Sequence, residues 1–162
     1  MRIQVTNNQK TAHPRIQSIR KLTEYLINTA SNLLPNRQWG DISIVLVDNA
    51  GMEPFNRKLF EKTGTTDVVS LCYEPVPGEN AAWAGDIVVN VELAVEMGRK
   101  LVRPGVSWGP ERELALYIAH GCDHFMGEDD ADEKGRARMR RRELRWVDGA
   151  GKEGLLDELL IR

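Results

Sequence analysis

The sequence predicts an α+β fold: one layered domain in which a mixed sheet of roughly four strands packs with five or six helices. The chain has 162 residues, of which 41% are apolar and 28% charged, and this balance fits one globular domain spanning residues 1–162. Short β-branched runs alternate irregularly with longer segments that have apolar residues at helical spacing. No internal repeat or low-complexity tract marks a domain boundary.

Four segments are predicted to be strands, either from alternating apolar residues or from an unbroken β-branched run. The run from Ile42 to Val47 is nearly all apolar, which is typical of a strand covered on both faces. The last two predicted strands are separated by a loop rich in proline and glycine, which favours an antiparallel pair. The predicted strands cover residues 3–6, 42–47, 67–73 and 84–91.

Apolar residues three and four positions apart predict the helices. In one of them Leu114, Ile118 and Phe125 form a stripe that we expect to face the core. Gly121, on the same stripe, suits a place where the helix packs closely against a neighbour. The predicted helices cover residues 15–34, 52–62, 91–101, 111–126, 131–146 and 155–161.

The stretch from His120 to Asp130 carries the chemistry. His120 and His124 are four residues apart, so a helix places both imidazoles on one face, within reach of a single ion. Gly127 suits a left-handed turn that ends the helix and lets Asp130 return toward the histidines. Three protein ligands and an open fourth position are typical of catalytic zinc, whereas structural sites are closed by four ligands. We therefore expect His120, His124 and Asp130 to hold a metal ion.

Two alternatives stay open for this stretch. Asp130 could instead cap the next helix, because Asp130 and Glu133 have the spacing of a capping box. A zinc metallopeptidase is an alternative enzyme class, because the histidine spacing is also that of zinc proteases. Those proteases place a catalytic glutamate directly after the first histidine, where this chain has Gly121, so a peptidase would lack its proton acceptor.

Three blocks of the sequence resemble the YbeY family of single-domain, metal-dependent endoribonucleases, which act in ribosomal RNA maturation and ribosome quality control. The family pattern His-Gly-x-Leu-His-Leu-x-Gly-Tyr-Asp-His is similar to residues 120–130, Thr-Asp-Val-Leu-Ser to residues 66–70, and Gly-Asp-Ile to residues 85–87. The resemblance implies a cytoplasmic hydrolase with one zinc ion, or nickel or another first-row metal, acting on RNA of the ribosome. A non-enzymatic ribosome-associated module with a structural metal is the alternative from another class.

The chain departs from the family pattern at two places of chemical interest. Asp130 stands where the family has a third histidine, and Phe60 falls where it has an arginine, six residues before the strand threonine. The cations near enough in sequence to replace that arginine are Arg57, Lys58 and Lys62. No general base is identifiable, so the expected nucleophile is a metal-bound water. The carboxylates that could take its proton are Asp86, Asp123 and Glu128.

The helix predicted after the motif is rich in arginine. Arg138 and Arg142 lie four residues apart, on one face of that helix. Guanidinium groups match the geometry of phosphate, so we expect Arg138 and Arg142 to bind the RNA backbone beside the metal. A solvated helix face paired with nearby acids is the alternative.

Charge and cysteine content limit the other classes. The net charge of −2 excludes a global basic field, so any RNA-binding surface must be a local patch. The two cysteines, Cys72 and Cys122, provide no disulfide framework. The sequence has neither a signal segment nor a run of eighteen apolar residues, so we expect a cytoplasmic protein without a membrane partner. The oligomeric state is not indicated.

Overall fold

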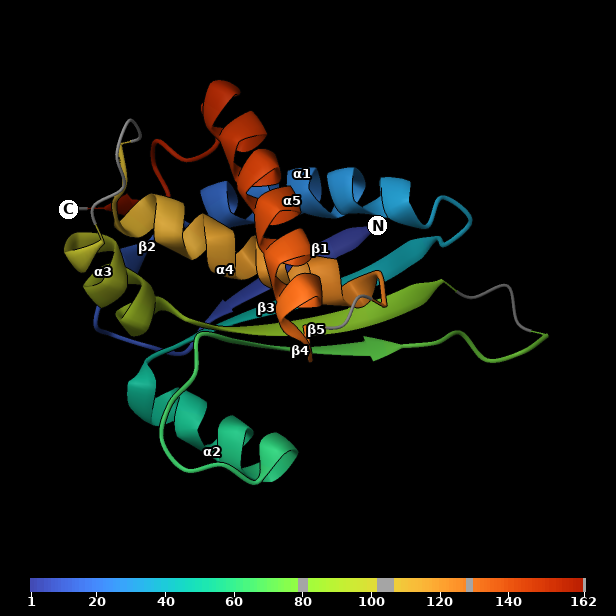
Figure 1. Cartoon of the computed structure of the whole chain (residues 1–162), viewed down its shortest axis with the longest axis horizontal. Helices are drawn as coiled ribbons and strands as arrows, with labels where there is room; N and C mark the ends of the chain where they lie inside the picture. Colours follow the sequence, from blue (N-terminus) through green and yellow to red (C-terminus); the bar gives the residue numbers. More distant parts are fainter. Residues whose placement is uncertain (79–81, 102–106, 128–129, 162) are drawn as a thin grey trace.

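The computed structural model describes residues 1–78, 82–101, 107–127 and 130–161. In that part of the chain, five α-helices surround one four-stranded sheet (Figure 1), and the predicted α+β fold is confirmed. The helices are α1 (Ile16–Ala30), α2 (Asn49–Phe60), α3 (Val91–Lys100), α4 (Pro110–Phe125) and α5 (Glu133–Lys152), and a 3-10 turn, Ser31–Leu33, follows α1. None of the described helices is long and apolar enough to cross a membrane.

The sheet is mixed and has the strand order β1-β3-β5-β4. Its strands are β1 (Arg2–Asn7), β3 (Trp39–Val47), β4 (Val68–Tyr73) and β5 (Trp83–Asn90). β3 pairs in parallel with both β1 and β5, and this central position explains its unbroken apolar run. β4 and β5 are antiparallel, as predicted, and β4 is an edge strand of the sheet.

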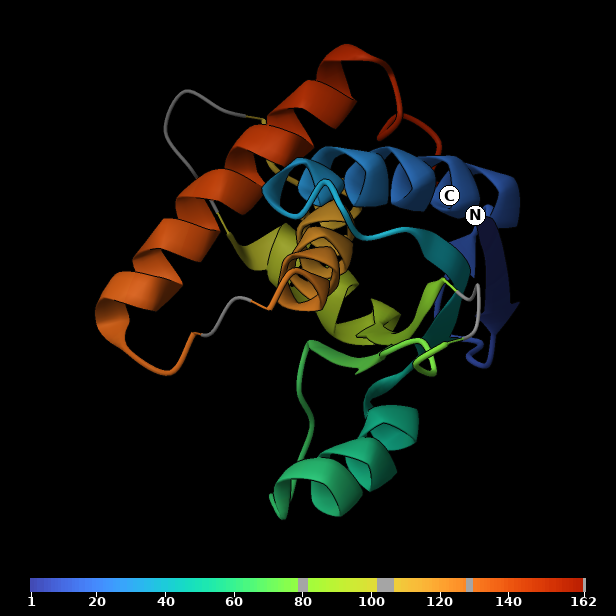
Figure 2. The same ribbon diagram turned by 90° about the vertical axis from the view of Figure 1, so that its right-hand side faces the viewer.

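The helices cover the two faces of the sheet unequally (Figures 1 and 2). α1, α4 and α5 lie on one side, whereas α2 lies alone on the other. The side chains of β5 alternate accordingly: Ile87 and Val89 belong to the large core under α1 and α4, and Val88 belongs to a small core with Met52 of α2. The large core therefore positions α4, which carries the two histidines.

Two glycines let α4 lie close against β5. A β-carbon added to Gly121 would be 2.9 Å from Cγ2 of Ile87, and one added to Gly85 would overlap the ring of Phe125. A side chain at either position would therefore push the helix away from the sheet. The prediction that Gly121 marks close packing is confirmed, and the glycine of the Gly85 block serves the same contact.

The predicted helix over residues 155–161 is wrong. Gly154 takes a left-handed conformation with φ of 74°, which turns the chain away from α5. Leu156 and Leu159 then pack into the large core from a series of turns. The last residues form a small second sheet, in which β6 (Leu160–Ile161) pairs with β2 (His13–Pro14). Apolar spacing over so short a segment does not distinguish a helix from turns packed on a core.

Candidate metal centre

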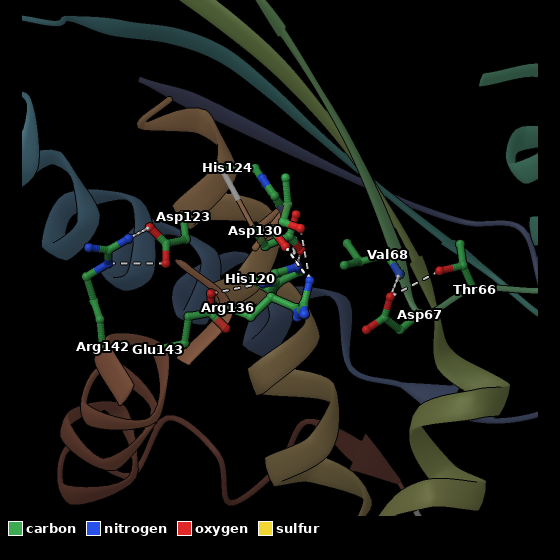
Figure 3. Close-up of polar contacts among 11 residues, drawn as sticks. Thr66, Asp67, Val68, His120, Asp123, His124, Asp130, Arg136, Arg142 and Glu143 are labelled. Atoms are coloured by element: carbon green, nitrogen blue, oxygen red, sulfur yellow. Dashed lines mark hydrogen bonds and ion pairs between the residues drawn. The ribbon is translucent and has the colours of Figure 1, made fainter. Parts of the chain in front are cut away.

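α4 presents both histidines near its C-terminal end. Pro110 occupies the first turn of the helix, where its missing N–H is not needed. At the other end Gly127 has φ of 80°, and its N–H donates to the carbonyl oxygen of His124 over 3.0 Å. This left-handed turn is the predicted one, and beyond it Asp130 lies beside His120 and His124 (Figure 3).

Three ligand atoms converge at this point. The Nε2 atoms of His120 and His124 are 3.1 Å apart, and Oδ2 of Asp130 is 3.5 Å and 3.7 Å from them respectively. Ligands around tetrahedral zinc, each about 2.0–2.1 Å from the ion, lie roughly 3.3 Å from one another. The two nitrogen donors and the carboxylate oxygen therefore fit a single first-row metal ion in both chemistry and spacing.

Asp132, not Asp130, caps α5. The side chain of Asp132 accepts the N–H of Gly135 over 2.6 Å, which is the N-terminal cap of that helix. The carboxylate of Asp130 instead faces the histidines, with its side chain 40% exposed. The capping alternative for Asp130 is therefore wrong, and its carboxylate is placed for ligation.

Glu143 of α5 orients His120. Its Oε2 lies 2.9 Å from Nδ1 of His120, and its side chain is only 1% exposed. When Nδ1 donates in this contact, the lone pair of Nε2 points toward the other two ligands. A carboxylate behind a metal-binding imidazole sets its orientation and raises its basicity. Glu143 was not anticipated, because a glutamate 23 positions away on another helix leaves no local pattern.

Negative charge surrounds His120. Burial lowers the pKa of this imidazole, but the hydrogen bond and charge of Glu143 and the charges of Asp67 and Asp130 outweigh burial, so its pKa is raised. The same three carboxylates favour any other positive charge at this position. The site is therefore electrostatically suited to a metal cation.

Arg142, which we expected to bind the RNA backbone, forms a buried ion pair instead. Its guanidinium makes two hydrogen bonds to the carboxylate of Asp123, at 2.6 Å and 3.2 Å, and both residues are buried. Burial raises the pKa of Asp123 to about 7 although Arg142 lowers it, and the carboxylate of Glu143 adds to the rise. This pair joins α5 to α4 behind the ligands, so the guanidinium of Arg142 is engaged there and is not presented to phosphate.

Two other arginines of α5 lie on the helix face that carries Glu143. Arg136 and Arg140 share a helix face with Glu143, at spacings of four and three residues. Arg136 donates to the backbone carbonyl of Asp130 over 3.1 Å. Burial raises the pKa of the Tyr117 hydroxyl on α4, and the charge of Arg140 opposes that rise. Arg138, the other predicted phosphate ligand, is exposed on a different face of α5.

A cleft of 670 Å³ opens beside the ligands. Its walls are the end of α2, the loop over residues 61–67, β4 and the histidine face of α4. Of the three cations near Phe60 in sequence, Lys62 lines this cleft, whereas Arg57 pairs with Glu53 over 3.4 Å. A larger hollow of 880 Å³ lies between α3, α4 and α5, but no member of the ligand group lines it.

The carboxylates considered as proton acceptors are not in the described part of this cleft. Asp86 points to the opposite face of the sheet from Ile87, and it accepts the hydroxyl of Tyr73 over 2.8 Å. Asp123 is held by its buried ion pair, and Glu128 lies outside the described residues. Asp67, to which we assigned no role from the sequence, is the described carboxylate that lines the cleft together with Asp130.

Fold and site together define an α+β protein that presents a His-His-Asp ligand group beside a polar cleft. The profile of the endoribonuclease YbeY family matches residues 4–151 of this sequence. The chain therefore belongs to the endoribonuclease YbeY family, as the resemblance of its three sequence blocks predicted.

Individual relatives agree with this assignment. A protein named endoribonuclease YbeY from Campylobacter jejuni (strain RM1221) is 31% identical over 121 residues, which cover 75% of this chain and 82% of the relative. A relative of the same name from Helicobacter pylori (strain P12) is 34% identical over 119 residues, covering 74% and 78%. The match to a Rhodopirellula baltica relative, 34% identical over 105 residues, covers 65% of this chain but only 51% of that longer protein.

A solved structure shares the fold. The solution structure of TM1509 from Thermotoga maritima aligns with a TM-score of 0.57 over 96% of this chain and 95% of that one. Its sequence is 18% identical, so this likeness concerns the fold alone.

Proposed function

We propose that this protein is a metal-dependent endoribonuclease that hydrolyses ribosomal RNA in the cytoplasm, in RNA maturation and quality control of the ribosome. The observation that carries the proposal is the convergence of His120, His124 and Asp130 at an open cleft. The relatives named endoribonucleases support RNA as the substrate. Zinc suits the donor set best, and nickel or another first-row ion is a chemically similar substitute.

A metal ion at this position would polarise a phosphate oxygen and make water more acidic. The residues of the chain itself supply the remaining functions. Glu143 holds His120 in the orientation needed for ligation, and Lys62, Arg136 and Arg140 attract phosphate groups to the cleft. Oδ1 of Asp67 already accepts the N–H of Val68 over 2.8 Å, which leaves Oδ2 to take a proton from the attacking water.

The packing of Gly121 argues against the peptidase alternative. The catalytic glutamate of zinc proteases would have to occupy this position, directly after His120. A β-carbon there would already be 2.9 Å from Ile87. A glutamate at this position would therefore require Ile87 or the helix to shift, which supports the nuclease over the peptidase.

Metal content and RNA cleavage together test the proposed function. We expect purified protein to hold up to one equivalent of zinc and to cleave a labelled ribosomal RNA precursor, with activity lost in chelator and restored by zinc. His124→Ala should lose both metal and cleavage. His13→Ala is the matched control, because His13 is the one histidine of the chain outside this ligand group and lies exposed in β2. A wild-type protein that takes up no zinc, or that cleaves equally well in chelator, would contradict the proposal.

A further inference from the structure

Phe60 is an exposed aromatic residue at the wall of the cleft. It is the last residue of α2, its surface is 50% exposed, and it lines the same cleft as His120 and His124. The small core beneath α2 contains Met52 and Phe55 but not Phe60. Phe125, the other phenylalanine at this cleft, is buried. Phe60 therefore contributes little to the core and presents its ring to whatever enters the cleft.

The backbone around Phe60 is held in a defined conformation. Glu61 has φ of 54°, the left-handed region that residues other than glycine seldom adopt, and its N–H donates to the carbonyl oxygen of Arg57 over 3.0 Å. The buried side chain of Asn56 donates to the carbonyl oxygen of Gly64 over 3.2 Å. These contacts end α2 sharply and fasten the following loop to it. The position of Phe60 is thus set by its neighbours, although its ring packs against little.

A cation lines the same cleft as this ring. Lys62, two residues after Phe60, also lines the cleft, and so do hydroxyl side chains of Thr63, Thr65 and Ser70. An aromatic face next to a positive charge is the combination with which proteins bind single-stranded nucleic acid, because the ring stacks on a base while the cation attracts the backbone. An apolar protein partner would be less well matched, because most of the described side chains around Phe60 in the cleft are polar or charged.

We infer that Phe60 is a specificity-determining residue: its ring stacks on an unpaired base that flanks the phosphate bound at the metal ligands. The inference rests on the endoribonuclease activity proposed above and adds the group that recognises the base. The sequence block of the family has an arginine at this position, which would attract the charged backbone instead. In this chain part of the binding energy should therefore come from a base, and that part should be insensitive to salt.

Substitutions at Phe60 separate stacking from general apolar contact. Phe60→Ala and Phe60→Leu should both lower kcat/KM on a short single-stranded RNA by roughly 5- to 150-fold, the range of base–aromatic stacking. Phe60→Trp should retain wild-type activity, because it keeps a flat aromatic face. Leu59→Ala is the matched control: Leu59 is the neighbouring residue, 40% exposed, and it does not line the cleft. Zinc content and thermal stability should be equal in all four variants.

Oligonucleotides with one abasic position identify the stacked base. In wild type, one abasic position should reduce kcat/KM by about as much as Phe60→Ala does, and in Phe60→Ala the same position should have no further effect. If Phe60→Leu is as active as wild type, or if every abasic penalty is unchanged in Phe60→Ala, the inference is overturned. Phe60 would then be an ordinary exposed apolar residue, or part of a protein contact.

Binding measured in chelator separates this inference from the proposed function. With cleavage prevented, the difference in RNA affinity between wild type and the Phe60 variants reports the contribution of the ring. Should wild type bind RNA but cleave none after zinc is added, the proposed activity fails, while the affinities still decide the role of Phe60. Should wild type bind no RNA either in chelator or with zinc present, both proposals fail.

Discussion

Asp130 makes the ligand group more negative than a third neutral histidine would. If it is a ligand, Asp130→Ala should lower zinc affinity by more than the roughly 10- to 100-fold typical of losing an outer partner. Asp130→His should retain the metal, because it replaces one ligand with another. Competition titration with a chromophoric chelator measures both. Asp132→Ala is the control: it removes the α5 cap, so it should cost about 1 kcal/mol of stability and leave zinc affinity unchanged. Equal zinc affinity in wild type and Asp130→Ala would exclude Asp130 as a ligand.

A substitution at Glu143 tests whether the orientation of His120 contributes to zinc affinity. Glu143→Gln has nearly the same shape but removes the charge behind the imidazole, so zinc affinity should fall roughly 10- to 100-fold. The same titration measures the loss, and circular dichroism checks that the helices are intact. Glu133→Gln, an exposed position in the first turn of α5, should bind zinc like wild type. An unchanged affinity in Glu143→Gln would mean that the contact with His120 is structural only.

Among the elements, the loop over residues 61–67 depends on one buried side chain. Nδ2 of Asn90 donates to the hydroxyl of Thr65 over 2.8 Å, and the backbone N–H of Asn90 donates to the carbonyl oxygen of Asp67 over 2.9 Å. Asn90→Ala removes the side-chain hydrogen bonds to Thr65 and to the carbonyl oxygen of Thr66, and it removes the cap on the N–H of Leu93, so it should cost about 1–3 kcal/mol of unfolding free energy. It should also lower kcat for RNA with little change in zinc affinity, because it loosens residues 65 and 66 beside Asp67, although the backbone bond to Asp67 itself remains.

Denaturant unfolding and cleavage kinetics measure the two effects of Asn90→Ala. Thr23→Val is a control for stability alone, because the Thr23 hydroxyl is buried in α1, away from the cleft. That variant should lose stability and keep kcat. If Asn90→Ala behaves in the same way, Asn90 supports only the fold.

Within α5, the two arginines on the face of Glu143 should contribute more to RNA binding than those on other faces. Replacing both Arg136 and Arg140 by glutamate should weaken RNA binding and flatten the dependence of log K on log salt by about 0.7 for each lost phosphate contact with a single strand. Fluorescence anisotropy at several salt concentrations gives this slope. Arg145→Glu, exposed elsewhere on α5, should leave it unchanged, and Arg138→Glu tests the original expectation. If the double variant has the same salt slope as wild type, these arginines do not contact phosphate and only form a solvated helix face.

For the whole molecule, bound zinc should stabilise the fold by linking α4 to the start of α5. Its proposed ligands lie on α4 and in the segment before α5, so a bound ion would join parts of the chain that separate on unfolding. Free zinc at 1,000 times the dissociation constant should stabilise the fold by about 4 kcal/mol, which raises Tm by on the order of 10 °C in a chain of this size. Thermal scans with zinc and then with chelator measure this shift. The same shift in His124→Ala would mean that zinc binds elsewhere.

The sequence by itself determined the features that depend on neighbouring residues. The spacing of His120 and His124 places them on one helix face, and the freedom of Gly127 to turn left-handed brings Asp130 back to them. The hairpin of β4 and β5 and the buried run of β3 follow equally from local pattern and loop length. These features could be predicted because their geometry is set within one element or one turn.

Only the tertiary structure decided which residues of distant elements meet. Glu143 reaches His120, Arg142 turns inward to Asp123 and Arg136 contacts the backbone of Asp130, because core packing sets the rotation of α5 on α4. All α5 arginines look alike in the sequence, and a rotation of about 100° per residue separates the buried Arg142 from the exposed Arg136. The C-terminal leucines were wrongly predicted to be helical for the same reason. Apolar spacing indicates which side chains are buried, but packing across the whole fold sets the partners against which they are buried.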